Sequence, residues 1–228
     1  MKKPGEFWEQ SEQVEKFAVR EPDERLRDLV EAFEAPERTR ILDLGCAGGR
    51  NTDFLARRGF DVYAVDASTA MVSRTRRRMA EVRDEAEAER RVRVGRMEDL
   101  ARFGAAMFDL VVALGVYHNA ADHPDWRRAL EETARVLRTG GRLLVATFAP
   151  GTDLTGEGMR RVEGTRHVYE GGPSGPLYLV DRETLDAEMA RCGLVPVVPT
   201  ETVEVETDAG RRVTVNGLYR RIPGSPSR

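Results

Sequence analysis

The sequence of 228 residues predicts an α/β fold, in which a doubly wound and mostly parallel sheet of seven strands carries helices on both faces. Five short runs are continuously apolar, as expected of strands buried on both faces, and polar stretches with helical spacing separate them. The runs are residues 41–44, 62–65, 92–94, 108–114 and 143–148. Because strands and helices alternate, the carboxyl ends of the strands should share one edge, where such sheets bind ligands.

The chain before the first strand, residues 1–39, is expected to form a helical cap. Apolar residues recur at helical spacing in this segment, and Pro22 interrupts the pattern before Asp23, a residue suited to start a second helix. Trp8 and Phe17 are the apolar anchors of the first helix. They either belong to an aromatic core or cover a ligand site.

A glycine-rich turn follows the first strand. Residues 45–49 lead into a helix, and glycines there allow a tight turn and close approach of a ligand. Asp66 ends the second apolar run, 17 residues past Gly49, where a carboxylate can accept hydrogen bonds from both hydroxyls of a ribose. The turn alone would equally well be structural. Together with Asp66 it predicts a site for an adenosine-containing cofactor.

The core over residues 40–149 continues with two helical patterns. Residues 73–91 are nearly all charged, with opposite charges within one helical turn, which is typical of a solvent-exposed helix face. Apolar residues from Trp126 to Leu137 then recur at three- and four-residue spacing. Pro124 and Gly140 are expected to bound this second helix.

Residues 150–180 are expected to form a substrate loop or lid. The stretch is rich in glycine and turn residues and is too long for an ordinary connection.

The C-terminal unit over residues 181–222 is expected to hold one helix and one hairpin. The helix should end at Gly193, and two strand-like runs, 202–206 and 212–215, flank a turn at Asp208-Ala209-Gly210. This pattern predicts an antiparallel hairpin. The final residues, 223–228, are expected to form a disordered tail.

The strand ends resemble those of class I S-adenosylmethionine-dependent methyltransferases, which have a Rossmann-like fold. The first motif of that family, Asp/Glu-x-Gly-x-Gly-x-Gly, stands here as Asp43, Gly45, Ala47 and Gly49. Alanine replaces the middle glycine, and we expect it to need a negative φ. The likeness covers about residues 41–148. The segment from Gly45 onward looks particularly like tellurite-resistance and thiopurine methyltransferases, which act on small and often soft nucleophiles.

The resemblance implies S-adenosyl-L-methionine as cofactor and assigns its contacts. The turn would pass the methionine moiety and Asp66 would hold the ribose, while Ala67, Met71 and Met97 would flank the adenine. Glu98 or Asp99 would reach the adenine amine. Taken alone, a methionine at such a position is more often a core residue. The expected cofactor residues are Asp43, Gly45, Cys46, Ala47, Gly49, Asn51, Asp66, Ala67, Met71, Met97, Glu98 and Leu114.

The end of the fourth strand lies nearest to the transferred methyl group in this family, and here it carries Tyr117 and His118. A sulfonium is already an activated methyl donor, so the protein mainly has to align the reactants and exclude water. His118 is either a general base or a histidine packed beneath the cofactor. Tyr117 either lines the acceptor pocket or closes the core. Both are candidate catalytic and substrate residues, and Trp8 and Phe17 are candidate substrate residues because this segment often caps the site in the family.

Composition restricts the partners. The formal net charge of -3 and pI of about 5.8 provide no basic excess for nucleic acid, and no apolar run is long enough for a signal peptide or membrane span. Cys46 and Cys192 lack paired ligands, so neither a disulfide framework nor a metal site is expected. We therefore expect a cytoplasmic protein that acts on a small molecule, of open oligomeric state.

Two other functions fit the same cofactor residues. An NAD-dependent oxidoreductase would use the turn and Asp66 for the adenosine half of its cofactor. Asp43 ahead of Gly45, and Gly140-Gly141 before the fifth strand, argue against that function. A non-catalytic S-adenosylmethionine-binding sensor or assembly protein would keep the turn and lose access for an acceptor.

Overall fold

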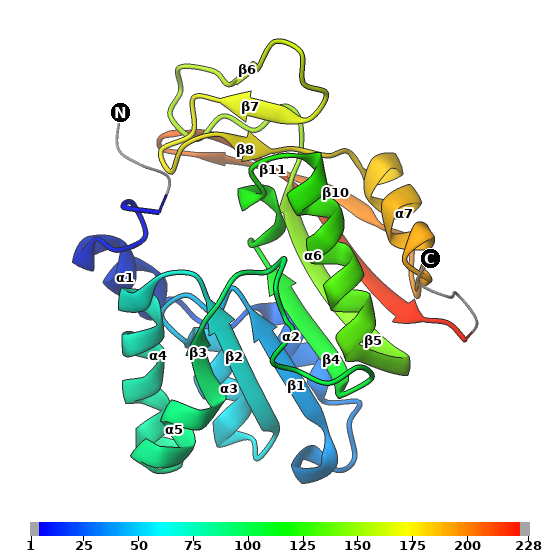
Figure 1. Ribbon diagram of the computed structural model, residues 1–228. Coiled ribbons are helices and arrows are strands. Elements are labelled where there is room, and N and C mark those ends of the chain that lie inside the picture. Colours follow the sequence, from blue (N-terminus) through cyan, green and yellow to red (C-terminus); the bar gives the residue numbers. More distant parts are fainter. Residues whose placement is uncertain (1–4, 224–228) are drawn as a thin grey trace.

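The main sheet follows the strand order β10-β11-β5-β4-β1-β2-β3 (Figure 1). The structure is a computed structural model that describes residues 5–223. Five strands run parallel, namely β1 (Arg40–Leu44), β2 (Asp61–Asp66), β3 (Val92–Val94), β4 (Phe108–Leu114) and β5 (Leu137–Phe148). The doubly wound sheet predicted from the apolar runs is confirmed.

The C-terminal hairpin extends this sheet beyond β5. β11 (Gly210–Arg221) is antiparallel both to β5 and to β10 (Glu201–Thr207), as the turn residues predicted, and the short β9 (Leu194–Pro196) pairs with the far end of β11. The strand that joins the hairpin to the sheet is therefore much longer than the predicted apolar run at 212–215.

Helices cover both faces and enclose two apolar cores. One core lies under α6 (His123–Val136) and α7 (Arg182–Arg191) and includes Trp126 and Met189. The other lies under α2 (Glu24–Val30), α3 (Arg50–Arg57), α4 (Thr69–Val82) and α5 (Glu85–Arg91). A 3-10 turn, η1 (Pro36–Arg38), connects α2 to β1. Among the described residues, 5–223, no helix is long and apolar enough to cross a membrane.

The N-terminal segment is helical, as predicted. α1 (Ser11–Ala18) and α2 are separate helices, and the Asp23 side chain accepts a hydrogen bond from the backbone N–H of Arg25 at the start of α2. α1 therefore ends at Ala18, before Pro22, and the capping Asp23 begins the next helix.

Two predicted helical segments differ in detail from the structure, although the charged stretch is helical and largely exposed as expected. The charged stretch at 73–91 is divided between α4 and α5, because Asp84 caps a new helix by accepting from the Glu87 N–H. α6 ends at Val136, and Leu137 already lies in β5. Gly140 is thus inside the strand and does not follow the helix directly. The pairing of β5 with β4 shifts register between Leu137 and Arg142. Gly140 and Gly141 therefore lie in an irregular first part of β5.

The segment expected to be a loop has a sheet of its own. β6 (Arg160–Arg161), β7 (Val168–Glu170) and β8 (Leu177–Tyr178) pair antiparallel and lie beyond the carboxyl ends of the main strands (Figure 1). β8 contacts η2 (Tyr117–Asn119), the 3-10 turn after β4. The predicted tail at 223–228 lies outside the described residues except for Pro223.

Candidate functional site

The glycine-rich turn is held in a left-handed backbone conformation. Gly45 and Gly49 have φ values of 76° and 84°, and Ala47 has a φ of 47°. The expectation of a negative φ at Ala47 was therefore wrong. Two hydrogen bonds hold this strained residue, because the Thr75 hydroxyl donates to its carbonyl at 2.7 Å and its N–H donates to Asp66 Oδ2 at 2.9 Å.

Asp66 connects the turn to the end of β2. Its Oδ1 accepts from the Ser68 N–H at 2.9 Å, while Oδ2 accepts from Ala47. Burial raises the pKa of this carboxyl, and the two backbone hydrogen bonds oppose the rise. Each carboxylate oxygen has a further lone pair. Asp66 can therefore shape the turn and still accept hydrogen bonds from ribose hydroxyls.

Asp43 lies beneath the turn. Its side chain is buried and accepts a hydrogen bond from the Thr52 hydroxyl at 2.6 Å, which ties β1 to α3. Burial raises its pKa to about 6, and the negative charge of Asp66 adds to the rise. The expected cofactor residue Asp43 therefore holds the first turn of α3, the helix that follows the glycine-rich turn.

Asn51, another expected cofactor residue, contacts the N-terminal cap. Its Oδ1 accepts from the Asp23 N–H at 3.0 Å and so anchors the start of α2 beside the turn.

Arg25 is a binding residue that sequence reasoning missed. Asp23 holds two of its guanidinium nitrogens, Nε at 3.0 Å and Nη2 at 2.7 Å, whereas Nη1 is buried with no hydrogen-bond partner. An orphaned cationic N–H suits a carboxylate, and the start of α2, which carries Arg25, is anchored to Asn51 just after the turn. The donor set therefore fits S-adenosylmethionine, with Arg25 for its carboxylate and Asp66 for its ribose. Arg25 lies outside every motif, so no sequence signal identified it.

The N-terminal segment lies against the start of α4, next to Asp66. The Ser68 hydroxyl donates to the Trp8 carbonyl at 3.1 Å, and the Glu9 carboxylate accepts from the N–H groups of Thr69 and Ala70 at 2.9 and 3.1 Å. Trp8 and Phe17 form an edge-to-face pair with centroids 5.4 Å apart. The backbone of Trp8 therefore lies beside the predicted adenosine site, and the Trp8–Phe17 ring pair belongs to the same segment.

α1 also closes against the turn itself. A Cβ on Gly48 would lie 2.7 Å from the backbone of Ala18, so only glycine allows this helix to pack so closely.

The expected adenine residues differ in exposure. Met71 and Met97 are buried, at 1% and 7% exposure, as core residues would be, whereas Ala67 is exposed. Glu98 forms an ion pair with Arg96, and Leu114 is half-buried at the end of β4. Cys46 is buried, and burial raises the pKa of its thiol, so it is no nucleophile.

The side chains of Tyr117 and His118 lie in different environments. The Tyr117 hydroxyl is within 2.7 Å of Thr133 Oγ1 on α6, and the ring is fully buried against Trp126. Of its two expected roles, this burial favours closing the core over lining the acceptor pocket, because Thr133 of α6 pairs with the only polar atom of the side chain. Burial raises its pKa, which keeps the phenol protonated.

His118 is stacked on Phe148 of β5, with ring centroids 4.0 Å apart. Its Nδ1 accepts from the Phe148 N–H at 3.4 Å, and burial lowers its pKa to about 3. The imidazole is therefore neutral at physiological pH and a weak base. This geometry favours the packing role over that of a general base.

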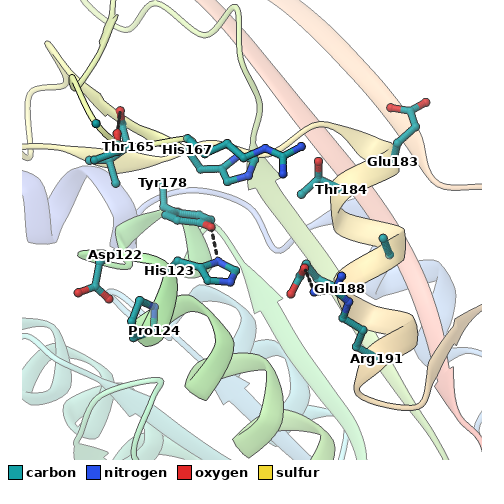
Figure 2. A pocket seen from close by; sticks show the side chains of 14 residues that line it. Asp122, His123, Pro124, Thr165, His167, Tyr178, Glu183, Thr184, Glu188 and Arg191 are labelled. Carbon is teal, nitrogen blue, oxygen red and sulfur yellow. Dashed lines mark hydrogen bonds and ion pairs between the residues drawn. The ribbon is translucent and has the colours of Figure 1, made fainter.

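A separate pocket of about 750 Å³ lies between the start of α6, β7, β8 and α7 (Figure 2). His123 Nδ1 is 2.8 Å from the Tyr178 hydroxyl in its wall, and Glu188 pairs with Arg191. None of its lining residues belongs to the glycine-rich turn or to the end of β4. The inserted sheet therefore builds a pocket of its own, apart from the predicted cofactor site.

Comparisons with known proteins agree with this geometry. Residues 42–145 match the family model described as "Methyltransferase domain". A ubiquinone biosynthesis O-methyltransferase from Caulobacter sp. (strain K31) is 36% identical over 112 residues, which are 49% of this chain and 42% of that protein. The chain thus aligns with less than half the length of this relative.

Two solved structures share the fold. A SAM-dependent methyltransferase from Methanosarcina mazei has a TM-score of 0.62 at 17% identity, covering 89% of this chain and 99% of that one. The 1,6-didemethyltoxoflavin-N1-methyltransferase of Burkholderia thailandensis, solved with S-adenosylhomocysteine, has a TM-score of 0.56 at 21% identity, covering 97% and 92%.

Proposed function

Residues 42–145 form a class I S-adenosylmethionine-dependent methyltransferase domain, and on that premise we propose that the chain methylates a small-molecule acceptor. The observation that carries the proposal is the hydrogen-bonded unit of Ala47 and Asp66, and the orphaned Nη1 of Arg25 belongs to α2, whose start is anchored to Asn51 after the turn. It offers an acceptor for ribose hydroxyls and a cation for a carboxylate. The NAD-dependent alternative loses its support with the family match.

The chemistry asks little of the protein beyond alignment. S-adenosylmethionine supplies an already activated methyl group when it is bound. Asp66 and Arg25 would fix its two polar ends, and the end of β4 would set the direction of approach of the acceptor. His118, neutral and stacked on Phe148, contributes packing and exclusion of water. The acceptor atom is then sulfur, selenium, tellurium or oxygen, and the described relative is an O-methyltransferase.

The partner and compartment follow from charge and thiols. A net charge of -3 disfavours a polyanionic acceptor, so we assign a small molecule rather than tRNA. Both cysteines are free, which suits a reducing compartment such as the cytoplasm. The narrower likeness to tellurite-resistance and thiopurine enzymes remains a prediction.

Radiolabelled methyl transfer tests the proposal. The acceptors are thiols, chalcogen oxyanions, phenols, bulk tRNA and cell-extract protein, and we expect label only on a small molecule. Label confined to tRNA or protein contradicts the acceptor class. Cofactor binding without any transfer would favour the sensor function, and tight binding of NADH in place of S-adenosylmethionine would overturn the cofactor.

The N-terminal segment is proposed to cover the bound cofactor, since Trp8 and Glu9 reach the start of α4 and Ala18 closes on the turn. Deleting residues 1–19 should lower cofactor affinity and turnover at least about tenfold, because burial of one large apolar side chain contributes roughly 1.5–3 kcal/mol. A chain without residues 224–228 is the control. Affinity and turnover that both survive the longer deletion would show that the segment has no part in the site.

A further inference from the structure

The N-terminal segment is attached to both sides of the predicted cofactor site. Near its start, the Trp8 carbonyl accepts from the Ser68 hydroxyl at 3.1 Å, just beyond the end of β2. At its other end, the Asp23 N–H donates to Asn51 Oδ1 at 3.0 Å, just after the glycine-rich turn that follows β1. The segment therefore joins the two parts of the site, and it would cover a cofactor bound between them.

The two attachments differ in burial. Near the turn, Ala18 is fully buried against Gly48, and Asn51 is buried as well. Glu9 and Glu15, which attach the start of the segment to α4, are both exposed. Exposed polar contacts contribute little to stability, because water readily replaces them. The start of the segment can therefore leave α4 while Ala18 stays in place as a pivot.

Glu9 and the expected ribose residue share the start of α4, against which α1 packs at the edge of the molecule (Figure 1). The Ser68 N–H donates to Asp66 Oδ1 at 2.9 Å, and the next two N–H groups, of Thr69 and Ala70, donate to the Glu9 carboxylate at 2.9 and 3.1 Å. The first N–H groups of a helix have no partner within it, and its positive end favours a carboxylate. The segment is therefore held by the same helix start that positions Asp66.

We propose that Glu9 is a positioning residue that holds the N-terminal segment closed over the cofactor site, and that release of its carboxylate from α4 controls how fast S-adenosylmethionine enters and S-adenosylhomocysteine leaves. The contact is reversible, because water can take the place of the carboxylate on the two N–H groups. This inference rests on the proposed function, in which the segment covers the bound cofactor, and it adds the residue that governs opening.

Such a contact has a specific kinetic consequence. Both hydrogen bonds of Glu9 are made to protein atoms, so losing them destabilises the closed segment equally in the free and the bound protein. Association and dissociation should then both become faster. The affinity should change little, because it depends only on the difference between the free and bound states. A residue that only stabilises the bound cofactor would change the dissociation rate alone.

Surface plasmon resonance with the full chain and S-adenosylhomocysteine measures both rates. Glu9→Ala should raise the association and dissociation rates about fivefold each, the scale of losing one helix cap, and leave Kd within about twofold. Glu9→Gln keeps one oxygen that can accept an N–H, so its rates should rise less. Glu12→Ala removes another exposed carboxylate from the same segment and should change neither rate.

The outcomes separate the inference from the proposed function. Unchanged rates in Glu9→Ala, or faster dissociation without faster association, would overturn the inference and leave the proposed function standing. Equal increases in Glu9→Ala and Glu12→Ala would indicate an effect of net charge and would also overturn it. Failure of the wild-type chain to bind S-adenosylhomocysteine would overturn the proposed function, and the inference with it.

Discussion

The two halves of the sheet's carboxyl edge are built differently. In the β1–β2 half, Ala47, Asp66 and Thr75 come from the turn and the strand and helix that follow it, and they hydrogen-bond to one another. In the β4–β5 half, the neighbours Tyr117 and His118 hydrogen-bond to two different elements, Thr133 of α6 and Phe148 of β5. The first half is therefore one connected unit whose glycines and carboxylate also form a pattern in the sequence, whereas the two residues of the second half are fixed by separate packing partners that form no such pattern.

The largest expected effect concerns Asp43 in the β1–β2 half. Burial raises the pKa of Asp43 from 3.8 to about 6. Between pH 3.8 and about pH 6, the folded protein therefore keeps the proton on this carboxyl while the unfolded protein has lost it. The free energy of unfolding then falls as pH rises through this range. Asp43→Asn removes this loss. Relative to wild type, the variant should gain about 3 kcal/mol between pH 3.5 and pH 7.5, at 1.36 kcal/mol per pKa unit.

Urea unfolding of the cofactor-free protein across that pH range measures the difference. Asp208→Asn, in the exposed hairpin turn, is the control. Parallel pH curves for wild type and Asp43→Asn would show that the buried carboxyl carries no such penalty.

Asp66 gives the next largest effect, on binding. Asp66→Ala should weaken S-adenosylmethionine binding by roughly 1.5–3 kcal/mol, the scale for losing hydrogen bonds to a charged group. Asp66→Asn keeps an oxygen for the Ala47 or Ser68 N–H and should lose less. Calorimetry decides, and unchanged affinity in the alanine variant would remove Asp66 from the ribose site.

In the β4–β5 half, His118→Ala should lower turnover by less than about a hundredfold, the low end of what general-base catalysis contributes. With a pKa lowered to about 3 by burial, the imidazole stays neutral above pH 4, so it should add no inflection near pH 6.5 to the rate profile. His123→Ala, in the separate pocket, is the control. Complete loss of turnover in a folded His118→Ala protein would show that His118 takes part in the chemistry, and it would contradict the packing role assigned to the β4–β5 half.

The smallest effect is expected at Tyr117. Tyr117→Phe should leave turnover within about twofold and cost roughly 1 kcal/mol of stability, because Thr133 loses its hydrogen-bond partner. Unfolding and kinetic measurements on the same preparation test both parts, with Tyr169→Phe as a half-buried control. A tenfold loss of turnover at unchanged stability would place the hydroxyl in the acceptor site.

The sequence by itself determined the parallel strands and the likeness to methyltransferases. Strands buried on both faces are continuously apolar. Runs such as residues 41–44 and 108–114 can therefore be recognised as strands from their own residues, without knowing which strands pair with them. The turn and Asp66 are also readable, because a strand end followed by glycines and a second strand end with a carboxylate meet in any parallel pair.

Tertiary structure alone decided which polar groups have partners within the fold. Asp23 leaves the Nη1 of Arg25 unpartnered, and Thr133 uses the hydroxyl of Tyr117. Ala47 adopts a positive φ against its own preference, since hydrogen bonds from Thr75 and to Asp66 hold it there. The outcomes at Tyr117 and Ala47 depend on contacts between residues far apart in the chain, and such contacts leave no periodicity or spacing in the sequence.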